Sequence, residues 1–229
     1  GHGRNGGYAD YCSVPAENAH AVGTELTDPE LATFCCAYVT AEHMLDRARV
    51  GEGETVLVTG ASGGVGSGLI QLCRARGAVP VAVSSEGYEA ALKEIGAEAV
   101  LLRGGKSLAM QLDAEVPGRP VDVVADLVGG KLFNELINLL KPEGRYISAG
   151  AIAGAVVPLD LRTVYLKHLE IHGSSQGSRK AFATLLCYIK SGKVRSLLDG
   201  VYALSQIHQA QLDFMSKKFF GKLVVVPDR

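Results

Sequence analysis

One segment of the sequence combines residue types and a spacing that suit the binding of an anionic ligand. A hydrophobic run, Val56–Thr59, is followed by a glycine-rich turn and then by a helical pattern that extends to Arg76. The first turn of a helix carries free backbone N–H groups and the positive end of its dipole, and glycines let a pyrophosphate approach them closely. The sequence therefore predicts a dinucleotide site formed by Ser62, Gly63, Gly64, Val65 and Gly66.

The same turn departs from the usual dinucleotide-binding pattern at one position. Ala61 stands where the G-x-G-x-x-G form has its first glycine. Gly66 is expected to let the helix pack closely against the strand. A glycine turn can also be a purely steric junction, but its place between a buried strand and a helix favours the cofactor site.

The residues after the second and third predicted strands bear on which dinucleotide is bound. Folds that bind NAD usually end the second strand with an acidic residue that holds the ribose 2′-hydroxyl. Here that strand ends in Ser84 and Ser85, whose small hydroxyl groups leave room for a 2′-phosphate. Arg103 after the third strand could supply positive charge, or could be a solvated loop residue. NADP(H) is favoured over NAD(H), and Glu86 is the main argument against this preference.

The elements around these residues predict a doubly wound α/β fold. From residue 55 onward, short β-branched runs alternate with amphipathic stretches of helical length, and several runs are apolar throughout, as in a parallel sheet covered on both faces. The predicted strands are Thr55–Thr59, Val79–Val83, Ala99–Leu102, Val121–Asp126, Arg145–Ala149 and Leu169–Gly173. The predicted helices between them span 65–76, 87–95, 106–115, 130–140 and 160–167.

The two ends of the chain follow a different pattern. Tyr8–Val14 reads as a short strand, and Asp28 with Pro29 marks the start of a helix of about twenty residues that ends at Arg49. Near the other end, Ser178–Ser191 and Ser205–Lys217 read as helices, and Lys222–Val226 as a closing strand.

Composition limits the classes of partner. The 229 residues are 47% hydrophobic and 21% charged, with a formal net charge of −1, so a globular protein is expected without a general attraction to nucleic acid or to acidic membranes. Charges, glycines or prolines interrupt every apolar run before it reaches membrane-spanning length. Five cysteines without a CxxC spacing favour a reducing cytoplasm over a disulfide framework. We expect a small-molecule substrate.

The motifs together identify a family. Residues 61–66 resemble the AxGGVG motif of the quinone-reductase-like medium-chain dehydrogenases/reductases, and the resemblance continues through Gly7–Tyr11, Thr40-Ala41, Glu94–Ala97, Asp122–Asp126 and Gly221-Lys222. Members of this family begin with a GroES-like catalytic domain. The resemblance therefore implies that residues 1–37 are the tail of that domain, that 38–189 form the Rossmann domain and that 190–229 return to the catalytic domain. About 100 residues would be missing, and the chain alone would be inactive.

The same resemblance suggests further site residues. It places the nicotinamide against Thr40, Leu127, Val128, Ala149, Gly150, Ala151 and the backbone near Ser174. In zinc-dependent alcohol dehydrogenases, the third ligand of the catalytic zinc is a cysteine four residues before this threonine, and Cys36 stands at that offset. Cys36 is thus either a zinc ligand in the intact enzyme or a packed structural cysteine.

Three functions compete on this basis. The first is an NADP(H)-dependent reductase that transfers hydride to an activated alkene, a quinone or a carbonyl. The second is a zinc-dependent alcohol dehydrogenase, and the third is a dinucleotide-binding protein without catalysis. For assembly, Leu169–Gly173 is expected to be an edge strand, and the resemblance implies a homodimer that joins two sheets through this edge.

Overall fold

The fold is described from a computed structural model, which defines residues 6–228; residues 1–5 and 229 of the two predicted end segments lie outside the described part. In chain order, the elements are a 3₁₀ turn (Ala16–Asn18), α1 (Asp28–Ala32), α2 (Ala37–Arg47), β1 (Thr55–Thr59), α3 (Gly64–Ala75), β2 (Val79–Ser84), α4 (Glu89–Glu94), β3 (Ala99–Leu102), α5 (Leu108–Glu115), β4 (Val121–Asp126), a 3₁₀ turn (Gly130–Leu132), α6 (Phe133–Leu139), β5 (Leu140–Ser148), α7 (Leu161–Leu166), β6 (Glu170–Gly173), α8 (Arg179–Lys190), β7 (Leu198–Ala203), a 3₁₀ turn (Leu204–Gln206), α9 (Ile207–Ser216) and β8 (Lys222–Val226).

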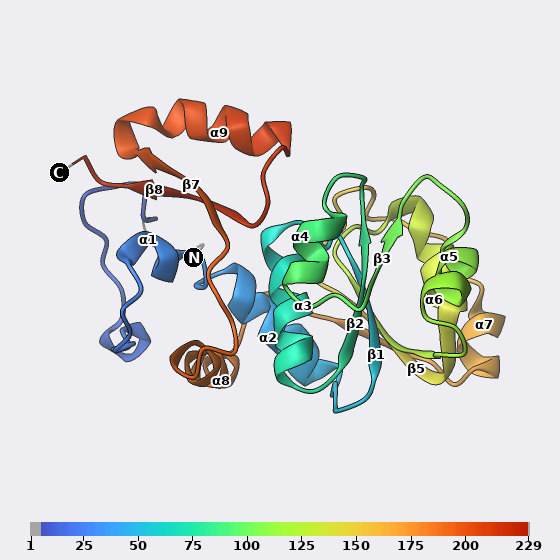
Figure 1. Ribbon diagram of the computed structural model, residues 1–229. Helices are drawn as coiled ribbons and strands as arrows, with labels where there is room; N and C mark the ends of the chain where they lie inside the picture. Colours follow the sequence, from blue (N-terminus) through green and yellow to red (C-terminus); the bar gives the residue numbers. More distant parts are fainter. Residues whose placement is uncertain (1–5, 229) are drawn as a thin grey trace.

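A parallel sheet of six strands, in the order β3-β2-β1-β4-β5-β6, forms the centre of the larger lobe (Figure 1). Helices α2, α3 and α4 cover one face, and α5 and α6 cover the other. Alternate residues of β1 point to opposite faces of the sheet. Val56 and Val58 pack in the hydrophobic core under α2, α3 and α4, and Leu57 packs in the core under α5 and α6. The predicted doubly wound α/β fold is confirmed.

The carboxyl ends of the central strands bring the predicted site residues to one edge of the sheet. Thr59 at the end of β1 is in register with Val83 of β2, and Asp126 at the end of β4 is in register with Ser148 of β5. The chain runs outward from β1 to β3 and then returns to β4 on the other side of β1. Open α/β sheets bind ligands at such a switch point, outside the carboxyl ends of the strands.

A second, two-stranded parallel sheet pairs β7 with β8, and α9 connects them (Figure 1). No strand was predicted between residues 173 and 222, so β7 is an addition to the predicted fold. Asp199 and Gly200 lie within β7, and both residue types are rare in strands, which explains the miss. The two sheets meet at the phosphate turn, where Gly63 forms an isolated bridge with Gly221.

The N-terminal predictions need correction. Residues 8–14 form no strand in the described part of the chain, and Tyr8 and Tyr11 are exposed. The single helix predicted from Asp28 to Arg49 is two helices. Between them the amides of Thr33 and Phe34 donate to carbonyls three residues back instead of four, and the Thr33 hydroxyl also donates to the Glu30 carbonyl. The N-cap is Thr27, paired with Glu30 in a capping box.

Other boundaries lie close to the predicted ones, except that β5 begins at Leu140 rather than Arg145. Strand β6 is the edge of the six-stranded sheet, as predicted. None of the helices within residues 6–228 is long and apolar enough to cross a membrane.

Candidate functional site

The turn between β1 and α3 places backbone N–H donors at the start of a helix. Gly60 has φ +60°, which favours glycine, and the turn closes through the amide of Gly63 and the carbonyl of Gly60 (3.1 Å). Gly63 is exposed and is the N-cap of α3, and no side chain caps the helix. The amides of Val65 and Gly66 in the first turn have no partner within the helix, so they are suited to bind an anion.

The three glycines of this motif have different tasks. A Cβ at Gly63 would come no closer than 3.4 Å to a neighbour, so the space above this residue is open. A Cβ at Gly66 would collide with the backbone of Gly60 and Ala61, so this glycine brings the helix against the turn, as predicted. The space for a Cβ at Gly64 is occupied by the Lys222 side chain, whose Cδ would lie 2.5 Å away. Gly64 therefore accommodates β8, and its predicted contact with the anion stays a prediction.

Lys222 is a site residue whose role the sequence left undecided between phosphate binding and a solvated cluster. Its aliphatic chain passes beside Gly64 at the start of α3, and the neighbouring Gly221 donates its amide to the carbonyl of Ser62 (3.3 Å). Gly221 has φ +91° and its Cβ would strike Leu197, so this position requires glycine. The Gly-Lys pair had a sequence signal, but its distance in the chain from the phosphate turn concealed the contact.

The ends of β2 and β3 meet as expected. The amide of Arg103 donates to the carbonyl of Ser84 (3.0 Å), and the Arg103 side chain is exposed. Ser84 is buried, and its hydroxyl has no hydrogen-bond partner among the described residues. Ser85 is half-buried and Glu86 is exposed.

A contact from the C-terminal segment adds charge to this corner. The Tyr88 hydroxyl donates to the carbonyl of Lys217 (2.9 Å), and the Tyr88 ring stacks on Phe220 at 6.2 Å between centroids. Lys217 has its Nζ over the Phe214 ring at 3.7 Å. The loop after β2 therefore contacts the segment that carries two adjacent lysines, Lys217 and Lys218.

The loops after β4 and β5 lie together over the phosphate turn. A Cβ at Gly60 would lie 3.3 Å from Val128, and a Cβ at Gly150 would lie 2.8 Å from the carbonyl oxygen of Leu127. The amide of Ala153 donates to the carbonyl of Val128 (2.9 Å). Leu127, Val128, Ala149 and Gly150 are thus gathered in one place, and Ala151 is exposed beside them.

Thr40 and Ser174 approach the site from outside the sheet. The amide of Ser174 donates to the carbonyl of Ser148 (2.8 Å), and the Ser174 hydroxyl is buried without a partner among the described residues. Three residues later, Gly177 packs so tightly on Val39 that a Cβ there would overlap the Val39 side chain. This contact brings the segment after β6 against α2, where Thr40 is half-buried.

Cys36 is exposed at the N-cap of α2. Burial raises the pKa of the adjacent Cys35 thiol, and the neighbouring Cys36 adds to this increase. Within residues 6–228, no group of three or more His, Cys, Asp or Glu side chains is arranged to hold a metal ion. The zinc interpretation therefore depends on Cys36 alone.

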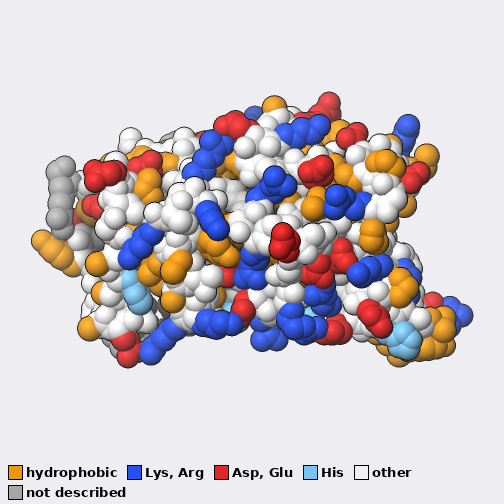
Figure 2. All heavy atoms as spheres, turned by 60° about the horizontal axis from the view of Figure 1, so that its bottom comes forward, with side chains coloured by type: hydrophobic (Ala, Val, Ile, Leu, Met, Phe, Trp, Pro, Cys, Tyr) orange, Lys and Arg blue, Asp and Glu red, His pale blue; other side chains and the backbone are white. Residues whose placement is uncertain are grey.

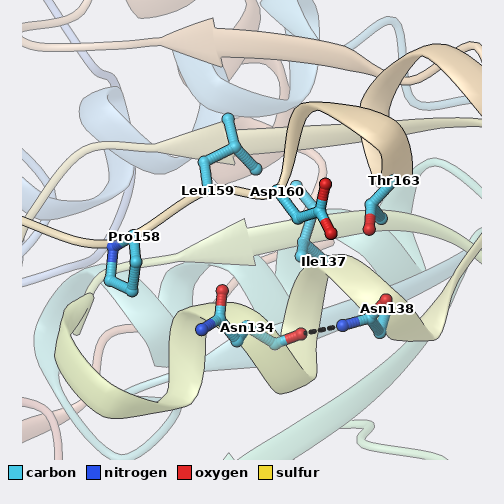
Figure 3. A pocket seen from close by; sticks show the side chains of 7 residues that line it. All are labelled: Asn134, Ile137, Asn138, Pro158, Leu159, Asp160 and Thr163. Carbon is cyan, nitrogen blue, oxygen red and sulfur yellow. Dashed lines mark hydrogen bonds between the residues drawn. The ribbon is translucent and has the colours of Figure 1, made fainter.

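A cavity of about 490 Å³ lies away from these residues, between α6 and the segment that leads into α7 (Figure 3). Its polar side chains include Asn134, Asn138, Asp160 and Thr163. Asn138 donates to the carbonyl of Asn134 (2.7 Å), and Asp160 caps α7 and pairs with Arg162. None of the predicted cofactor residues lines this cavity, so it is separate from the candidate site.

Comparison with known proteins gives a family. The sequence profile of the zinc-binding dehydrogenases matches residues 64–191. The chain is 29% identical to acryloyl-coenzyme A reductase of Metallosphaera sedula, over 96% of this chain and 65% of that protein. It is 27% identical to an NAD-dependent alcohol dehydrogenase of Sulfolobus acidocaldarius, over 96% of this chain and 64% of that protein. The chain thus spans about two thirds or less of the length of these relatives.

Solved structures give the same picture. A crystal structure of a protein from Sinorhizobium meliloti 1021 that is described as an alcohol dehydrogenase matches with a TM-score of 0.96 and 67% identity, over 99% of this chain and 63% of that one. The 2-octenoyl-CoA carboxylase reductase CinF from a Streptomyces species, in complex with NADP and 2-octenoyl-CoA, matches with a TM-score of 0.87 and 28% identity, over 93% of this chain and 53% of that one.

Proposed function

Because the chain belongs to the zinc-binding dehydrogenase family, we propose that it is the cofactor-binding part of an NADP(H)-dependent oxidoreductase that transfers hydride to an activated alkene, a quinone or a carbonyl. The observation that carries the proposal is the uncapped N-terminus of α3, opened by the exposed Gly63 at the carboxyl edge of the sheet. The medium-chain oxidoreductase resemblance of the sequence is confirmed by the family and by the named relatives.

The described residues fit a dinucleotide. The hydroxyls of Ser84 and Ser174 are buried and have no partner within residues 6–228. Because buried polar groups are nearly always hydrogen-bonded, both are suited to receive a ligand. In the proposed complex, Ser62, Gly63, Val65 and Gly66 hold the pyrophosphate together with Lys222. Thr40, Leu127, Val128, Ala149, Gly150, Ala151 and Ser174 border the nicotinamide. The cofactor supplies the hydride, and these residues bind and orient it.

The preference for NADP(H) is supported by the residues at the ends of β2 and β3. Ser84 and Ser85 put no carboxylate at the ribose position, while Arg103 and the Lys217–Lys218 segment bring positive charge to the same corner. Among the relatives, one is named for NAD and another was crystallised with NADP, so their names support either dinucleotide.

The alternative function is a zinc-dependent alcohol dehydrogenase. It is favoured by the family description and by the exposure of Cys36, four residues before Thr40. A catalytic zinc has three protein ligands, and the described residues supply one candidate, so the reductase is the better supported of the two.

The proposed function is tested by fluorescence titration of the 229-residue chain with NADPH and with NADH. We expect saturable binding of both and a lower dissociation constant for NADPH. Hydride transfer is tested by the consumption of NADPH in the presence of an enoyl thioester, a quinone or an aldehyde. A chain that binds neither dinucleotide would contradict the proposal.

A first prediction concerns the choice of dinucleotide. Ser85→Asp should lower the NADPH/NADH affinity ratio at least about tenfold, because a carboxylate repels the 2′-phosphate and accepts hydrogen bonds from a ribose diol. Arg103→Ala should weaken NADPH by only about two- to fivefold, since its exposed charge is screened. Lys106→Ala, which removes another exposed charge of the same loop, is the control. An unchanged ratio in both Ser85→Asp and Arg103→Ala would remove these residues from the site.

We also propose that the chain assembles as a homodimer through β6. The strand is the edge of the sheet, and Figure 2 shows hydrophobic atoms at the surface of the end of the molecule that Figure 1 labels α7. Exposed hydrophobic side chains belong to β6 (Ile171), to the preceding α7 (Leu161, Tyr165 and Leu166) and to the segment before α7 (Ile152 and Val156). Exposed apolar patches and unpaired sheet edges are both features that oligomers cover.

A further inference from the structure

A single buried carboxylate lies beneath the loop that borders the proposed nicotinamide site. Asp126, at the end of β4, is fully buried and accepts hydrogen bonds from the hydroxyls of Thr59 and Tyr146, each at 2.5 Å. It also accepts the backbone amides of Val128 (2.9 Å) and Gly129 (3.1 Å to the nearer oxygen). Burial of a carboxylate is costly unless donors compensate it, and here both oxygens are compensated.

The donors come from three places that the fold must hold in register. Thr59 ends β1, Tyr146 belongs to β5, and the two amides belong to the loop after β4. The Thr59 hydroxyl in turn accepts the amide of Leu127 (2.9 Å). The three consecutive amides of residues 127, 128 and 129 are therefore all fixed by Asp126 or by its partner Thr59.

The second loop of the site is fixed to the same residue. The amide of Ala149 donates to the carbonyl of Asp126 (3.2 Å), and the Gly150 Cα lies close to the Leu127 carbonyl, where a side chain would not fit. Further along, the loop after β5 contacts the loop after β4 again, where the amide of Gly130 donates to the carbonyl of Gly154 (3.0 Å). The Asp126 carboxylate therefore fixes the loop after β4, and the loop after β5 is held against that loop by these backbone contacts and by Tyr146 in β5.

We propose that Asp126 is a positioning residue that sets the two loops after β4 and β5 and thereby determines affinity for the nicotinamide half of the cofactor without touching it. The inference rests on the proposed dinucleotide function. It assigns to Asp126 an effect on one half of the ligand only. The adenosine half is proposed to bind at the ends of β2 and β3, whereas the donors to the Asp126 carboxylate come from β1, β5 and the loop after β4.

The chain offers a matched control in the same strand. Asp122 stands at the opposite end of β4, is also buried, and accepts the amide of Thr55 (2.7 Å) and the ammonium of Lys141 (2.5 Å). Its loss removes a buried carboxylate and destabilises the fold, but it leaves the loops at the carboxyl edge in place. Asp122→Asn therefore separates a general loss of stability from a specific effect on the site.

The test compares the affinity for NADPH with the affinity for adenosine 2′,5′-bisphosphate, which lacks the nicotinamide half. In Asp126→Asn one of the two acceptor oxygens becomes an NH₂ group, which would face hydrogen-bond donors in either orientation of the side-chain amide. We expect NADPH affinity to fall about ten- to a hundredfold, with the bisphosphate affinity within about twofold of the parent. Tyr146→Phe should shift the ratio in the same direction by less, and Asp122→Asn should not shift it.

The outcomes distinguish the two levels of the proposal. A parent chain that binds neither ligand overturns the dinucleotide function and this inference with it. A parent that binds both, with an unchanged ratio in Asp126→Asn, overturns the positioning role alone. If Asp126→Asn does not fold, Tyr146→Phe and Thr59→Val decide, since each removes one donor from the carboxylate; an unchanged ratio in both would reject the role.

Discussion

Gly63→Val is expected to leave the chain folded and to reduce its affinity for NADPH by about a hundredfold or more. Gly63 is exposed and has φ −78°, a conformation that valine adopts, so the substitution should cost about 1 kcal/mol of stability or less. The branched side chain would fill the open space above the first-turn amides of α3. A pyrophosphate would then lose two or three charge-assisted hydrogen bonds, each worth about 1.5–3 kcal/mol.

Gly66→Ala provides the contrast, because its Cβ would meet the backbone of Gly60 and Ala61 rather than the ligand. Overpacking of this kind costs about 1–3 kcal/mol, so this variant should lose stability in thermal unfolding as well as affinity. The measurement is a fluorescence titration with NADPH beside a denaturant melt for both variants. Full NADPH affinity in Gly63→Val would show that the anion site is elsewhere.

The local parts of the site were predictable because their signals are local. Strand β1 is buried at every residue, and its continuous hydrophobic run correctly predicted a strand. The glycine turn follows within the next few residues. The serines at the end of β2 and the arginine after β3 met as expected because parallel strands end at the same edge. The hydrogen bonds of Asp126 were not foreseen, although its position at the end of β4 was.

The features that the sequence did not predict depend on contacts between segments far apart in the chain. Lys222 reaches the phosphate turn from β8, which pairs with β7. Strand β7 contains an aspartate and a glycine, which are rare in strands, so the sequence pattern did not predict it. Tyr88 meets Lys217 across 129 positions of sequence. The interruption between α1 and α2 has the same origin, since the Thr33 hydroxyl contacts Ser196 (3.1 Å) as well as the Glu30 carbonyl.

Ile171→Pro is expected to convert the proposed homodimer into single chains. Along β6, alternate amides face the same side, and the amide of Ser174 donates inward to the carbonyl of Ser148. The amide of Ile171, three residues earlier, therefore points out of the sheet, and its side chain is 46% exposed. Proline would remove this outward donor without removing a bond to β5. A two-fold interface contains Ile171 from both subunits, so the substitution removes two donors from the interface. The dimer dissociation constant should therefore rise at least about tenfold.

The control is Ile171→Val, which keeps both the amide and a β-branched side chain and should leave the dimer intact. Mass is measured by light scattering at micromolar concentration, where the parent should give twice 24.1 kDa and Ile171→Pro should approach the single-chain value. Unfolding curves of the two variants should agree closely, because β5 and β6 retain their ladder. A parent of one chain would reject a stable dimer. A proline variant that remains dimeric would move the contact away from β6, to the exposed side chains of α7 and residues 152–156.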